Sequence, residues 1–276
     1  MKKLRKYQVG IVYGVLTVIS VIVMFPLFWL FITSLKTTPE IYRFPITYYP
    51  HDLTSVHYQK IIDLNFPRFF FNSIAIGLGT MSIAILIGIF PAYAFARFRF
   101  PYKNILLISI LISQMFPMVS FVIPIFQLLK RMNLMNSYGG IILSYIPFVS
   151  PVVVWILKNF FENVPIELEE AAMIDGCSRL QALVRVIFPL IGPGVSSTGI
   201  YVFLFVWAEL MFALSFLTSP SMQTISVFLT LFVGEYQTRW GPLFAASIIS
   251  AIPPLVAFTL LQKHFIAGLT AGGVKG

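Results

Sequence analysis

Six long apolar stretches constrain the fold of this chain more than any other feature. A helix that crosses a bilayer needs about 20 mainly apolar residues. The 276 residues are 58% hydrophobic and 11% charged, whereas soluble domains carry about 25% charged residues. We therefore expect an all-α integral membrane protein with six transmembrane helices. The expected spans are residues 11–33, 72–94, 105–128, 138–157, 195–217 and 243–262.

The basic residues indicate how these spans are oriented. The first span is too long for the apolar core of a secretory signal, and no small-residue cleavage site follows it. If the N-terminus is cytoplasmic, twelve of the 19 Lys and Arg residues fall on inner segments. Cytoplasmic loops of membrane proteins are enriched in these residues. We expect a multi-pass protein of the cell membrane, one domain over residues 1–276, with both termini in the cytoplasm.

Residues 163–189 interrupt the apolar pattern with an acidic, helix-prone segment. Pro165 suits the start of a helix, and the glutamates that follow complement the positive end of the helix dipole. Gly176 can end this helix in the left-handed conformation. A second helix is expected over residues 178–188, where apolar residues recur at helical spacing. The segment predicts a helix–turn–helix, which on these local features alone is also compatible with an ordinary solvated hairpin.

The order and spacing of this segment resemble the EAA signature of ABC-importer permeases. Glu170-Ala171-Ala172 is followed by Gly176, by the apolar Val186 and Phe188, and by Pro189. The family usually has Ile and Leu at the two apolar positions. The resemblance implies a cytoplasmic coupling helix, between the fourth and fifth spans, that docks on a separate ATPase subunit. The residues implied for this contact are Glu169, Glu170, Ala171, Ala172, Asp175, Gly176 and Pro189, with Asp175 bracing the turn.

Two further stretches are similar to carbohydrate permeases, especially the G-type subunit of maltose/maltodextrin importers. The first is the Gly-rich end of the chain, and the second is Trp207-Ala208-Glu209-Leu210 with the later Trp240-Gly241. The resemblance implies that the cytoplasmic tail, residues 265–276, reaches into the ATPase interface, although so short a terminus can also simply fray. The tail residues implied are Thr270, Gly272, Gly273 and Lys275.

Glu209 is a carboxylate inside the expected fifth span. A charge there costs a few kcal/mol or more, so it needs a partner or water. With Trp207 it either lines the translocation path or anchors neighbouring helices. The external loop, residues 218–240, resembles the loop that contacts the sugar-binding protein in maltose systems. The contact residues implied are Glu235, Tyr236, Gln237 and Trp240.

The resemblance implies a permease subunit of an ATP-driven, binding-protein-dependent importer of disaccharides or oligosaccharides. Its implied partners are a homologous second permease, two ATP-binding subunits and an extracytoplasmic sugar-binding protein. No cofactor is expected on this chain, because it has no Walker A loop; ATP-Mg would bind the partner subunits. No nucleic-acid partner is expected.

The sequence gives less support to other function classes. A membrane enzyme is disfavoured, because the three histidines lie outside the expected spans and no His, Cys and carboxylate cluster has metal-ligand spacing. An ion-coupled secondary carrier usually needs several intramembrane carboxylates or an inverted repeat, and Glu209 stands nearly alone. Import of a non-sugar solute by the same ABC mechanism stays open.

Overall fold

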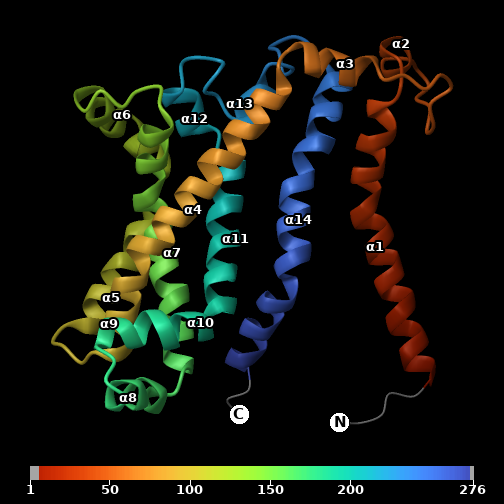
Figure 1. Cartoon of the computed structure of the whole chain (residues 1–276). Helices are drawn as coiled ribbons and strands as arrows, with labels where there is room; N and C mark the ends of the chain where they lie inside the picture. Colours follow the sequence, from red (N-terminus) through yellow and green to blue (C-terminus); the bar gives the residue numbers. More distant parts are fainter. Residues whose placement is uncertain (1–5, 274–276) are drawn as a thin grey trace. The chain divides into compact units, whose positions relative to one another are not determined.

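The computed structural model describes residues 6–273, with the side chains of residues 9–260, and Figure 1 shows the course of its helices. The chain forms two compact units. The first unit consists of Met1–Phe66 with Leu229–Ile252, and the second consists of Pro67–Phe228 with Pro253–Gly276. Within residues 6–273 every regular element is a helix; one isolated antiparallel bridge joins Val233 and Thr238. The expected all-α class is confirmed.

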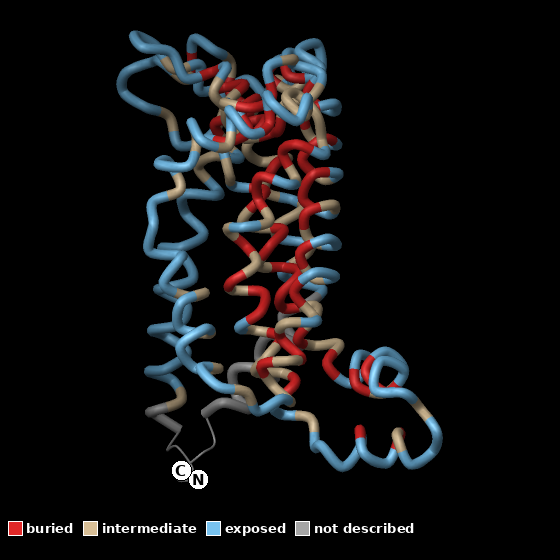
Figure 2. The backbone as a smooth tube through the Cα atoms, turned by 90° about the vertical axis from the view of Figure 1, so that its left-hand side faces the viewer, coloured by how far each residue is buried: buried red, intermediate tan, exposed pale blue. Residues whose placement is uncertain are grey.

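The first unit contains one long helix, two short ones and the start of another long one. These are α1 (Lys6–Ser34), α2 (Thr38–Ile41), α3 (Val56–Asp63) and the first part of α14 (Trp240–Gly273). The most apolar window of α1 contains no buried residue, and Figure 2 shows this helix as exposed along most of its length. A helix that is apolar on every side needs lipid or another protein around it.

Buried polar side chains organise the segment between α1 and α3. Lys36, Glu40 and His57 are all less than a tenth exposed. Lys36 Nζ donates to the Thr47 carbonyl. Glu40 Oε1 accepts from Thr47 Oγ1 at 2.8 Å and from the His51 amide at 3.0 Å. His57 Nε2 donates to the Lys36 carbonyl at 2.9 Å. These hydrogen bonds hold the backbone between α1 and α3 in place.

The second unit is a bundle in which α7 and α11 pack along each other. Its buried residues follow these helices in Figure 2, and Tyr145, Leu157, Phe161 and Phe212 are almost completely buried. Its α-helices, besides the end of α14, are α4 (Phe66–Arg97), α5 (Lys103–Ile112), α6 (Val122–Arg131), α7 (Tyr138–Asn163), α8 (Ile166–Ile174), α9 (Arg179–Ala182), α10 (Phe188–Leu190), α11 (Gly192–Ala208), α12 (Met211–Phe216) and α13 (Ile225–Thr230).

Two expected spans are not single straight helices. The stretch 105–128 breaks near Pro117, and its two halves meet at 90°; a proline cannot donate the backbone hydrogen bond that would continue the helix. The stretch 195–217 breaks at Glu209, which has an extended backbone between α11 and α12. The helical segment Arg179–Leu190, which precedes α11, meets α11 at 77°.

Four helices are individually long and apolar enough to cross a membrane. They are Val9–Ser34, Phe66–Arg97, Tyr138–Asn163 and Trp240–Leu260. Counting each bent pair as one span raises the number to six. The protein is therefore a helical, multi-pass membrane protein.

Candidate functional site

The acidic segment forms a short helix, α8, that ends as the sequence predicts. Gly176 has φ +90°. Its amide donates to the Met173 carbonyl at 3.1 Å, and the Cys177 amide donates to the Ala172 carbonyl at 3.0 Å. This pair of bonds is the Schellman arrangement, which satisfies the last carbonyls of a helix. Asp175 was expected to brace this turn, but within the described residues its exposed side chain makes no hydrogen bond; the backbone of Gly176 and Cys177 does so instead.

The second helix of the segment starts from a side-chain cap. Ser178 Oγ accepts from the Gln181 amide at 3.3 Å, and Gln181 Oε1 accepts from the Ser178 amide at 2.8 Å. This reciprocal pair satisfies two amides at the helix start. The chain then winds through a π-helical turn, Leu183–Ile187, into α10, which contains Pro189. Figure 1 places α8, α9 and α10 at one end of the second unit and α6 and α12 at the other.

The residues implied for ATPase contact separate into two groups. Glu170, Ala171, Asp175, Gly176 and Pro189 are exposed. Glu169 and Ala172 are buried, with 3% and 7% of their surface exposed. Glu169 and Ala172 are three residues apart, so they share one face of α8. The sequence pattern alone did not show that the rest of the chain covers this face. A surface built from this segment therefore excludes Glu169 and Ala172.

Glu169 is surrounded by groups from other elements. Tyr93, on α4, donates its hydroxyl to Glu169 Oε1. Arg97, one turn further along α4, places Nε 3.1 Å from Glu169 Oε2. Neither of these two buried atoms has a hydrogen-bond partner within the described residues, so the contact is an ion pair without hydrogen-bond alignment. Arg179 of α9 places Nε 3.8 Å from Glu169 Oε1. The carboxylate joins three helices.

The two arginines differ in burial. Only 8% of the Arg97 side chain is exposed, compared with 52% for Arg179. Arg97 also donates to the Val164 carbonyl at 2.9 Å, just before α8 begins. The Arg179 guanidinium lies 5.0 Å above the Phe98 ring. A small hollow of about 80 Å³ lies beside this cluster; its lining residues are Arg97, Phe98, Ile166, Glu169, Glu170, Met173 and Arg179.

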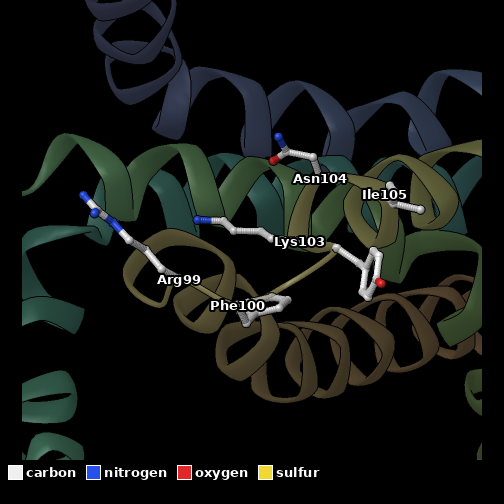
Figure 3. Close-up of a pocket in the computed structure, with 6 residues that line it drawn as sticks. Arg99, Phe100, Lys103, Asn104 and Ile105 are labelled. Atoms are coloured by element: carbon white, nitrogen blue, oxygen red, sulfur yellow. The ribbon is translucent and has the colours of Figure 1, made fainter.

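The turn between α4 and α5, at the same end of the second unit, carries further positive charge. A hollow of about 460 Å³ lies there. In Figure 3, the side chains of Arg99 and Lys103, two of its lining residues, extend in the same general direction. Tyr102 has φ +62° at this turn, and Lys103 Nζ donates to the Phe98 carbonyl at 3.3 Å. Arg99 is exposed and Lys103 is partly buried.

Glu209 occupies the break between α11 and α12. Its Oε1 accepts from the Phe212 amide at 2.8 Å, and its Oε2 accepts from the Ala213 amide at 3.2 Å. Tyr145 of α7 donates its hydroxyl to Oε2 at 2.6 Å. Ser226 donates to the Glu209 carbonyl at 2.6 Å. Glu209 was expected halfway along a continuous span; this is wrong, because it lies where the helix ends and its carboxylate caps the next one.

Trp207 lies in the packed interior of the second unit rather than on an open surface. It is 8% exposed and stacks on Phe203, with ring centroids 5.4 Å apart, while Phe70 meets it edge-on at 5.7 Å.

The residues implied for binding-protein contact lie in a tight turn of the first unit. Val233 bridges Thr238, and the Arg239 amide donates to the Phe232 carbonyl at 2.8 Å. Gly234 is required here, because an added Cβ would lie 2.8 Å from the Gln237 carbonyl oxygen. All four of Glu235, Tyr236, Gln237 and Trp240 are exposed, and Tyr236 is 94% exposed.

Two other expectations concern the tail and metals. Thr270, Gly272 and Gly273 lie beyond the residues whose side chains are described, and Lys275 lies outside the described residues altogether. Among the described residues, no group of three or more His, Cys, Asp or Glu side chains is placed to hold a metal ion.

Comparison with known proteins identifies the family. Residues 84–270 match the binding-protein-dependent transport system inner membrane component family. The sulfoquinovosyl glycerol transport system permease protein SmoH of Agrobacterium fabrum is 39% identical over 254 residues, which cover 92% of this chain and 89% of that protein. The trehalose/maltose transport system permease protein MalG of Thermococcus litoralis is 34% identical over 261 residues, 93% of each chain.

Solved structures support the fold. A chain of a bacterial ABC transporter involved in the import of the acidic polysaccharide alginate superposes with a TM-score of 0.81 at 20% identity, covering 96% of this chain and 100% of that chain. The family match covers more than half of the sequence, and both relatives exceed 30% identity over more than nine-tenths of it. This protein therefore belongs to the inner membrane components of binding-protein-dependent transport systems.

Proposed function

We propose that this chain is one permease subunit of an ATP-driven, binding-protein-dependent importer of disaccharides or oligosaccharides. The observation that carries the proposal is the similarity to permeases named for sugars and sugar derivatives, which extends over more than nine-tenths of the chain. The breaks in two of the apolar stretches are compatible with this role, because irregular backbone at membrane depth is tolerated where it is buried in protein or lines a cavity.

The α8–α9 hairpin is the proposed contact for an ATPase subunit. Glu170, Ala171 and Gly176 form an exposed surface of small and acidic residues, and small side chains let another protein approach closely. Ile174 is 86% exposed, and an isolated apolar side chain of this kind gains free energy when a partner covers it. ATP and Mg²⁺ would bind the partner subunits.

The remaining partners follow from the same proposal. A homologous second permease would complete the pathway and cover apolar surface that this chain leaves exposed. An extracytoplasmic sugar-binding protein would contact the turn that presents Glu235, Tyr236, Gln237 and Trp240. In a solved structure of the same fold, an alginate transporter is in complex with a periplasmic protein carrying an alginate pentasaccharide. Both termini and the α8–α9 hairpin would then face the cytoplasm, where the tail would reach the ATPase.

Glu209 and Trp207 serve, in this proposal, as a structural anchor. Every contact described for Glu209 holds helices together: two amides of α12, a hydroxyl of α7 and the hydroxyl of Ser226. Trp207 is packed among other aromatic rings.

Co-purification from native membranes, followed by reconstitution, tests the proposal. Mass spectrometry of material bound to the tagged chain should identify a second permease, an ATPase and a solute-binding protein. The reconstituted assembly should import at least one of radiolabelled maltose, trehalose and diacetylchitobiose when ATP is supplied. ATP-driven uptake of only non-sugar solutes would refute the assignment of sugars as the cargo. Ion-driven uptake by the chain alone would refute the proposal of an ATP-driven importer.

Gly176→Pro tests the docking role of the hairpin. Proline cannot adopt φ +90° and has no amide to donate to Met173, so the turn after α8 must change shape. We expect the variant to insert normally but to lose most ATP-driven uptake while the ATPase stays active. Gly192→Ala is the matched control, because nothing lies within 4 Å of the added Cβ. Normal uptake by Gly176→Pro would contradict the docking assignment.

A further inference from the structure

Glu169 is the acidic residue directly before the exposed Glu170, but its own side chain is buried. Only 4% of its side chain is exposed, and both carboxylate oxygens lie against groups of α4 and α9. A buried charge with this set of partners is not free to meet a separate subunit. Glu169 is therefore directed toward the interior of its own chain.

The contacting side chains of α4 share one face of that helix. Tyr93 and Arg97 are four residues apart, so they lie one above the other, and Arg97 is the last residue of α4. Arg97 touches α8 twice, once at the carboxylate of Glu169 and once at the Val164 carbonyl that precedes the helix. The start of α8 is thus fixed to the end of α4 by both a side chain and the backbone.

Charge burial makes this connection stiff. An ion pair removed from water is attracted more strongly than one in solvent, and separating its members leaves a charge without compensation. Glu169, Arg97 and Tyr93 can therefore move apart only at a large cost, whereas the half-exposed Arg179 is screened by solvent. A displacement of α8 has to carry the end of α4 with it.

We infer that Glu169, Arg97 and Tyr93 are positioning residues that transmit movement of the α8–α9 hairpin to the spanning helix α4. The inference rests on the proposed function, in which ATPase subunits move this hairpin. Glu170 and Gly176 then meet the ATPase, while Glu169, next to them in sequence, passes the movement into the membrane.

The test measures sugar imported per ATP hydrolysed in the reconstituted importer. The variants are Glu169→Gln, Arg97→Gln and the double variant. The probe is whichever of labelled maltose, trehalose and diacetylchitobiose the wild type imports. We expect each single variant to lower uptake per ATP about 10-fold, within the range of coupling between distant sites, while ATP hydrolysis and co-purification of the ATPase persist. The double variant should be no worse than the poorer single variant, because both remove one connection.

Glu167→Gln is the matched control, since Glu167 is an exposed acid in the same first turn of α8, and we expect it to leave uptake per ATP unchanged. Tyr93→Phe removes one hydroxyl and keeps the ring, so it remains informative if the charge variants fail to fold. It should lower uptake per ATP about threefold, as the loss of one hydrogen bond implies.

Three results would overturn the inference: unchanged uptake per ATP in the variants, additive effects in the double variant, or loss of ATPase binding in Glu169→Gln. The last result would make Glu169 a docking residue. Failure of the proposed function is recognised separately, because the wild type itself would then recover no ATPase or import none of the three sugars. Hydrogen exchange of α8 in the isolated chain, expected to increase in Glu169→Gln, tests the connection without any partner.

Discussion

Glu169 and Glu209 lie in the same compact unit, and different groups stabilise their charges. Glu169 meets two guanidinium groups and a tyrosine hydroxyl contributed by other helices. Glu209 meets two backbone amides of the helix that follows it and a tyrosine hydroxyl. All partners in the first arrangement come from other helices, so it can transmit movement. The second arrangement is mainly local, because two of its three partners are amides of the helix that follows Glu209, and Tyr145 adds one contact from α7.

The comparison predicts that removing a cation is most harmful where the cation is buried. Arg97→Met should lower the free energy of unfolding by about 3–5 kcal/mol, because it leaves the buried charge of Glu169 uncompensated. Arg179→Met should cost less than about 1 kcal/mol, since Arg179 is half exposed and lies further away. Denaturant unfolding in mild detergent measures both. Equal losses would show that burial does not distinguish the two arginines.

Glu209 should be less sensitive to loss of charge than to loss of hydrogen-bond acceptors. Glu209→Leu leaves the Phe212 and Ala213 amides and the Tyr145 hydroxyl without this partner, and should cost about 3 kcal/mol. Glu209→Gln keeps one acceptor oxygen and should cost about 1 kcal/mol. The same unfolding measurement compares them. A Gln variant as unstable as the Leu variant would mean that the negative charge itself holds α12.

His57, in the first unit, is a buried basic group, in contrast to the carboxylates of Glu169 and Glu209. Burial, reinforced by the nearby Lys60, lowers the pKa of His57 below its usual 6.5, although its hydrogen bond to the Lys36 carbonyl acts in the opposite direction. The unfolded chain then binds the proton more readily than the folded chain, so stability is lost as pH falls below about 6.5. The buried Lys36 and Glu40 lie in the same segment, and burial also lowers the pKa of Lys36.

Hydrogen exchange of residues 34–66 at pH 7 and pH 5 measures this effect, which should be smaller than the two above. Protection against exchange, after correction for the slower intrinsic exchange at lower pH, should be weaker at pH 5 in the wild type. His57→Gln, which keeps a side-chain donor, should remove most of the difference, whereas His51→Gln serves as the control and should retain it. A pH dependence that survives in His57→Gln would assign the titration to another group.

Local sequence signals predicted much of the hairpin. Gly176 ends α8 with a positive φ as expected, and helical spacing located the second helix, although part of it is a π turn. The burial of Glu169 was not predicted, because its partners Tyr93 and Arg97 lie more than 70 residues earlier in the chain. Tyr93 and Arg97 are four residues apart at the end of an apolar helix, so they share one face of it. This spacing was the available sequence signal for a polar site that could receive Glu169.

The break at Glu209 was also not predicted. Apolar residues continue on both sides of Glu209, and composition reports only that a segment prefers lipid or protein to water. An acidic residue followed by helical residues can cap a new helix, and this was the available signal.

The sequence by itself determined that the chain is a helical membrane protein, where its apolar stretches lie and which family its acidic segment resembles. These properties depend on composition and short-range spacing, which need no knowledge of distant contacts. Only the tertiary structure decided that two apolar stretches bend, that Glu209 caps a helix and that Glu169 faces inward. The burial of Glu169 depends on which side chains arrive from remote segments, because a buried charge is tolerated only where its partners are. The break near Pro117 and the cap at Glu209 depend mainly on neighbouring residues, whose effect inside an apolar stretch composition does not reveal.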